Sequence, residues 1–114
     1  MPDIEKQIAL LSGKRALAEA AVLWSRRETQ FDDARRWAVV AHARRRLGVE
    51  KLEAGSTAMG EHLLRMATVA EAMVATCLQL AEDLFEEARA MEIRSRICYE
   101  EAEERHAVAT AAVR

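Results

Sequence analysis

The chain has 114 residues, of which 51% are hydrophobic, 4% are aromatic and 32% are charged. A chain of this length forms a single domain, residues 1–114, and buries only part of the surface that its unfolded form exposes, which excludes a large aromatic core. Its formal net charge of −2 excludes a strong overall attraction to nucleic acid or to an anionic membrane.

The charge is divided unevenly between the two halves of the chain. Residues 1–51 carry 11 Lys or Arg against 7 Asp or Glu, whereas residues 52–114 carry 6 against 12. The first half therefore has a charge of +4 and the second half a charge of −6. This split indicates that the chain folds back on itself so that the two halves attract each other.

A first long helix is predicted over about residues 3–47. Pro2 presets the backbone angle of a first helical turn, and Asp3 places an acidic side chain beside the positive end of the helix. No further proline or glycine pair interrupts the sequence before Gly48. Residues with capping-box spacing near Ser25 leave open a break in this helix.

Three closely spaced glycines, Gly48, Gly55 and Gly60, predict a turn over about residues 48–57. Ser56 and Thr57 can accept hydrogen bonds from the first free amides of a following helix. A second long helix is therefore predicted over about residues 58–112.

The first predicted helix has a seven-residue apolar repeat that marks one packing seam. A second row of small residues, which includes Gly13, Ala20, Ala34 and Ala41, lies three residues later in each heptad. A seam with one large row and one small row lets another helix approach closely. The large row consists of Leu10, Leu17, Trp24 and Phe31.

The second predicted helix has an apolar alternation of four and three residues over four heptads. After Leu84 the alternation takes an extra step of four residues to Ala88, which predicts a stutter in the coiled coil. The large residues of this predicted seam are Met59, Leu63, Met66, Met73, Leu80 and Leu84, with Ala70 and Cys77 between them.

These patterns predict an all-α fold, an antiparallel two-helix hairpin with coiled-coil packing. One seam on each helix leaves further apolar residues uncovered, among them Ile8, Leu11, Val39 and Val69. We therefore expect the hairpin to complete a helical bundle by oligomerisation or by docking on a partner. The uncovered apolar faces therefore predict a non-enzymatic interaction protein, such as a scaffold, assembly or chaperone-like subunit of a larger complex.

An alternative function rests on the arginines of the first half. Arginine clusters bind phosphate groups, so these residues could contact nucleic acid or another anionic surface. Groups nine residues apart alternate between opposite sides of a helix and do not form one basic stripe. We therefore expect a protein partner first and a nucleic-acid partner second. The possible partner or anion contacts are Arg35, Arg36, Arg44, Arg45 and Arg46.

The sequence contains no nucleophile paired with a base, no glycine-rich phosphate loop and no Cys or His cluster with metal-ligand spacing. We therefore expect no enzymatic activity, no cofactor, no metal and no small-molecule substrate. No run of about 18 uncharged apolar residues indicates a membrane span. Cys77 and Cys98 are expected as free thiols, which is typical of a reducing cytoplasmic compartment.

Overall fold

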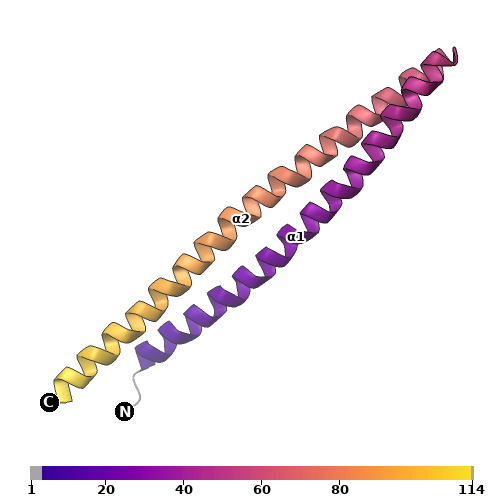
Figure 1. Ribbon diagram of the computed structural model, residues 1–114. Coiled ribbons are helices and arrows are strands. Elements are labelled where there is room, and N and C mark those ends of the chain that lie inside the picture. Colours follow the sequence, from indigo (N-terminus) through magenta and orange to yellow (C-terminus); the bar gives the residue numbers. More distant parts are fainter. Residues whose placement is uncertain (1–3, 114) are drawn as a thin grey trace. The chain divides into compact units, whose positions relative to one another are not determined.

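A computed structural model describes residues 4–113 of the chain, and these residues form two long helices (Figure 1). Helix α1 spans Ile4–Glu53, and helix α2 spans Thr57–Val113. The helices run in opposite directions and pack against each other, and the described residues contain no strand. The predicted all-α antiparallel helical hairpin is confirmed.

The connection between the helices is shorter than the predicted turn over residues 48–57, because α1 continues to Glu53. Gly55 ends this helix with a backbone φ of 86°, a left-handed conformation that glycine adopts without strain. The Ser56 amide donates to the Lys51 carbonyl at 2.8 Å, and the Gly55 amide donates to the Leu52 carbonyl at 3.0 Å. This pair of bonds is the Schellman motif, which satisfies carbonyl groups at the helix end.

Helix α1 continues without interruption through the segment near Ser25 where the sequence left a break open. The Ser and Thr side chains of this segment are exposed on the helix surface. Because α1 is continuous here, the capping-box spacing does not begin a new helix.

The hairpin divides into two compact units, each of which contains a segment of both helices. Unit one combines the described parts of Met1–Ser25 and Leu84–Arg114, and unit two is Arg26–Asp83, which includes the turn. In both units residues of α1 contact residues of α2 that lie far away along the chain.

Small residues form the buried interior of both units. In α2 the buried residues are Gly60, Ala67, Ala70, Cys77, Ala81, Ala88, Ser95 and Ala102, so the step from Leu84 to Ala88 in the predicted seam reaches a buried residue. In α1 the buried residues are Ala9, Gly13, Ala16, Ala20, Leu23, Ala34, Ala41 and Gly48. Leu23 is the one large side chain among the buried apolar residues, and none of the larger side chains described is completely buried.

In unit one, a buried serine and a tryptophan tie the helices together. The Ser95 hydroxyl donates to the Gly13 carbonyl at 2.9 Å, which satisfies a polar group inside the seam. The Trp24 ring meets the Phe85 ring edge to face, with centroids 5.6 Å apart. The indole NH of Trp24 also donates to the Glu92 carboxylate at 2.6 Å.

In unit two, Gly48 and Gly60 bring the helices closest together near the turn. A Cβ atom at Gly60 would lie 2.6 Å from Cγ of Leu52 and 2.9 Å from the carbonyl oxygen of Gly48. A Cβ atom at Gly48 would lie 3.1 Å from the Gly60 carbonyl oxygen. Backbone atoms of one helix therefore occupy the space where a side chain of the other would begin.

Ion pairs within one helix outnumber those that join the helices among the pairs described. Arg105 pairs with Glu5 in unit one, and Arg45 pairs with Glu71 in unit two. The other pairs join residues three or four apart on the same helix, such as Arg15 with Glu19. Exposed pairs of this kind contribute only about 0 to 1 kcal/mol each, so packing of the small residues carries the fold.

Replacement of Gly60 by alanine tests the close approach near the turn. Alanine favours a helix over glycine by about 1 kcal/mol, but the added methyl group would meet Leu52 and the Gly48 backbone. We expect Gly60→Ala to lower the free energy of unfolding by about 1 to 3 kcal/mol, measured by urea denaturation. Leu52→Ala in the same chain should recover only part of the loss, because the Gly48 carbonyl remains. A more stable Gly60→Ala protein would contradict the observed approach.

Candidate protein-interaction faces

Most large apolar side chains of this hairpin lie outside its seam. Residues on both helices keep more than a third of their surface exposed, with Leu11 at 65% and Val39 at 69%. Single exposed apolar residues are ordinary, but a series along one helix face indicates a surface that binds another protein or a second copy. The exposed set on α1 is Ile4, Ile8, Leu11, Leu17, Val22, Val39, Leu47, Val49 and Leu52, and on α2 it is Met59, Val69, Leu78, Leu80, Ile93, Ile97 and Val108.

The large residues predicted for the packing seam are exposed or partly buried, whereas Ala70 and Cys77 of the same predicted seam are buried. Leu17 is 46% exposed, Met59 is 53% exposed and Leu80 is 44% exposed. A second row of buried residues in α2, at Gly60, Ala67 and Ala81, lies one residue after Met59, Met66 and Leu80. The other predicted seam residues, Leu10, Trp24, Phe31, Leu63, Met66, Met73 and Leu84, are partly buried.

One flank of unit two forms an apolar surface that we call the methionine face. It consists of Trp37, Val40 and Leu47 on α1 and of Met59, Leu63, Met66, Met73 and Leu80 on α2. The Arg45–Glu71 pair marks the opposite flank. In an antiparallel helix pair, equivalent heptad positions of the two helices lie on the same flank. The eight residues of the methionine face lie on the flank of the hairpin that is opposite Arg45 and Glu71.

A second apolar stripe runs along α1 in unit one, on the side away from α2. Ile4, Ile8 and Leu11 follow steps of four and three residues, and Val22 continues the same stripe. These side chains are between 51% and 65% exposed. The spacing is that of a second coiled-coil seam, so α1 presents one seam to α2 and another outward.

Most arginines proposed as anion contacts already have carboxylate neighbours. Arg35 bonds Asp32 at 2.5 Å, Arg36 lies 3.9 Å from Asp33, and Arg46 lies 3.4 Å from Glu50. Arg45 donates through Nε to Glu71 at 2.8 Å. Arg44 is partly buried and has no ion pair within the described part of the chain. The five arginines therefore do not form one free basic surface.

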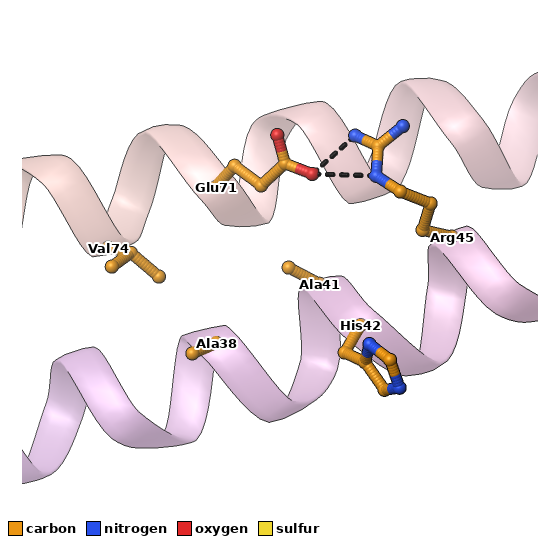
Figure 2. A pocket seen from close by; sticks show the side chains of 6 residues that line it. All are labelled: Ala38, Ala41, His42, Arg45, Glu71 and Val74. Carbon is orange, nitrogen blue, oxygen red and sulfur yellow. Dashed lines mark hydrogen bonds and ion pairs between the residues drawn. The ribbon is translucent and has the colours of Figure 1, made fainter.

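The Arg45–Glu71 pair borders a shallow pocket in unit two, which Figure 2 shows from close by. The pocket has a volume of about 340 Å³ and is lined by Ala38, Ala41, His42, Arg45, Glu71 and Val74. Figure 2 shows Ala38, Ala41 and Val74 in the gap between the helices, while the His42 ring lies along the outside of α1. Arg45 and Glu71 bond each other across this gap, so their charges are directed at each other and not at a bound molecule.

His106 in unit one has a contact with the other helix. The Lys6 ammonium donates to Nδ1 of His106 at 3.1 Å. Among the residues that the structure describes, no three His, Cys, Asp or Glu side chains are grouped so that they could hold a metal ion. Cys77 is buried in the seam, Cys98 is partly buried, and both are free thiols.

Helix α2 meets the length and composition test for a membrane span. A window of 18 residues has a mean hydropathy of 1.3, and 17% of that window is buried in the hairpin. One such helix is weak evidence for a membrane span, because core helices of soluble proteins pass the same test.

Comparison of the chain with protein-family models, with curated proteins and with solved structures finds no match.

Two neighbouring residues in α2 distinguish the hairpin seam from the candidate interaction face. Ala81 is 1% exposed and Leu80 is 44% exposed. We expect Ala81→Asp to lower the free energy of unfolding by about 3 kcal/mol or more, because it buries an unpaired charge. Leu80→Asp should cost about 1 kcal/mol in dilute protein, measured by circular dichroism during urea denaturation. Equal losses would mean that both positions lie in the seam.

Proposed function

We propose that this chain is a non-enzymatic interaction protein, a scaffold or assembly subunit that acts through apolar helix faces. The observation that carries the proposal is the partition of side chains: most of the buried residues are alanine or glycine, and the described Leu, Ile, Met and Val residues other than Leu23 are partly buried or exposed. A protein whose larger apolar residues remain at the surface gains by covering them with another helical surface.

The energetics of the seam support association. Burial of a methylene group contributes about 0.8 kcal/mol, whereas full burial of Leu, Ile or Met contributes about 1.5 to 3 kcal/mol. A seam of alanines therefore supplies less stabilisation per residue than an ordinary core. Ordering each backbone residue opposes folding by about 1 to 2 kcal/mol, which leaves the isolated hairpin with little margin. Covering the flanks supplies the larger part of the hydrophobic stabilisation that this sequence can gain.

Light scattering after size exclusion, over a hundredfold range of concentration, tests the proposal directly. If the faces cover each other in a self-association, the mass should correspond to a fixed number of chains. The melting temperature should then rise by several degrees with concentration, because association stabilises the folded chain by mass action. If the faces fit another subunit, the isolated chain should be poorly helical or aggregate. A compact, fully helical monomer with a concentration-independent melting temperature would overturn the proposal.

The alternative function is binding of nucleic acid or another anionic surface. Its support is the run of Arg44, Arg45 and Arg46 near the turn, of which Arg44 has no carboxylate partner in the part of the chain that the structure describes. The carboxylate partners of Arg45 and Arg46 weaken it, because each pair lowers the local positive potential.

Salt dependence tests this alternative. An anion-binding surface predicts affinity for duplex DNA that falls steeply between about 50 and 200 mM salt, and a change of the three arginines to glutamine should abolish it. A triple change of Arg89, Arg94 and Arg96 to glutamine removes the same charge from α2 and serves as the control. Equal binding at low and high salt, or equal loss in both variants, would exclude the arginine run as the binding surface.

A further inference from the structure

We propose that the methionine face of unit two is covered by a second copy of this chain, related by a two-fold axis, with Asp33 of each protomer against Arg44 of the other. This inference rests on the proposed interaction function and names its partner. It derives from the placement of two charged residues within an otherwise apolar surface.

Asp33 and Arg44 are charged residues at the heptad positions that α1 contributes to this flank. Both are partly buried in the single chain, whereas neighbouring charged residues such as Asp32 and Arg46 are exposed. Asp33 has only a long contact of 3.9 Å with Arg36, and Arg44 has no ion pair within the described residues. Covering the face with a purely apolar partner would bury both charges without adequate partners, which is strongly unfavourable.

A second copy supplies the missing partners because the two charges are placed symmetrically. An axis that passes midway between residues 38 and 39 of α1 relates Asp33 of one protomer to the partner's Arg44. The same axis sets Trp37 against the partner's Val40. Each copy therefore supplies the acid and the base that the other copy lacks, and two ion pairs form with one on each side of the axis.

The register of the hairpin carries the same axis into α2. Gly48 contacts both Gly60 and Leu64, which sets residues 38 and 39 of α1 opposite residues 71 and 72 of α2. A two-fold axis at that level places Leu63 against the partner's Leu80 and brings Met66 to the level of the partner's Cys77, which is buried in its own hairpin seam. All of these residues are apolar, and methionine adapts its shape to an opposing surface. The symmetry that pairs the charges on α1 thus also pairs apolar residues on α2.

The size of the face suits a dimer of this kind. From Met59 to Leu80 the face extends for roughly 30 Å at 1.5 Å per residue, and two helices side by side give it a width of roughly 20 Å. Each copy would then bury roughly 600 Å², so the total of roughly 1,200 Å² falls at the lower end of stable interfaces. The product is a four-helix bundle formed from two hairpins.

Charge reversal followed by mixing tests this arrangement. Asp33→Arg leaves each contact with two arginines, and Arg44→Asp leaves each contact with two aspartates. We expect each variant alone to have a dimer dissociation constant raised by roughly a hundredfold or more, measured by sedimentation equilibrium. An equimolar mixture of the two variants should recover a two-chain species, because each contact then contains one acid and one base. Recovery can be read even if each variant alone loses helicity.

Adjacent residues provide matched controls. Asp32→Arg and Arg46→Asp make the same charge changes at exposed positions on the outer side of α1. Each should leave the dimer unchanged. A dimer that persists in Asp33→Arg and in Arg44→Asp, or a mixture that remains monomeric, would overturn the proposed pairing while the interaction function stands. Association of the chain only with a different protein would also overturn it. A wild-type monomer that is stable at every concentration would overturn both.

Discussion

The close approach of two helices over small side chains is the constraint on which this structure depends. Where the Gly60 backbone lies against Leu52 and Gly48, no room remains for even one methyl group. The alanines along the rest of the seam allow a similarly close packing, and their burial removes little apolar surface from water per residue. Helix packing at this distance also explains how the Ser95 hydroxyl reaches the Gly13 carbonyl of the opposite helix.

This constraint decides where the larger side chains lie. A seam filled largely by backbone and methyl groups leaves little room for Leu or Met, so all of these residues that the structure describes except Leu23 are partly buried or exposed. The same hydrophobic sequence therefore yields a seam of small residues and an exposed apolar surface. The two consist largely of separate residues, so a substitution at Leu80 changes the exposed surface more than the seam.

The sequence was sufficient to predict the two helices, their antiparallel arrangement and the position of the turn within a few residues. Of the seam predicted for α2, Ala70 and Cys77 are buried, whereas Met59 and Leu80 are exposed. The large residues Met59, Met66, Met73 and Leu80 were assigned to the seam because hydrophobic periodicity favours the largest apolar residues as core. A further buried row begins at Gly60 and continues through Ala67 and Ala81, and its signal was the seven-residue spacing of small residues. That signal was noted in α1 and applies equally to α2.

The small row of α1 also has one exception that coincides with the division of the hairpin into two units. Gly13 and Ala20 belong to unit one, whereas Ala34 and Gly48 belong to unit two, and Arg27 occupies the heptad position between them. An arginine cannot pack as a methyl group does, and its guanidinium instead lies 4.7 Å from the centre of the Phe31 ring. The seam is therefore two runs of small residues and not one. Each unit has its own close approach, at Gly13 with Ser95 and at Gly48 with Gly60, and each has its own uncovered apolar surface. A chain built in this way has two separate exposed apolar surfaces while its helices remain continuous.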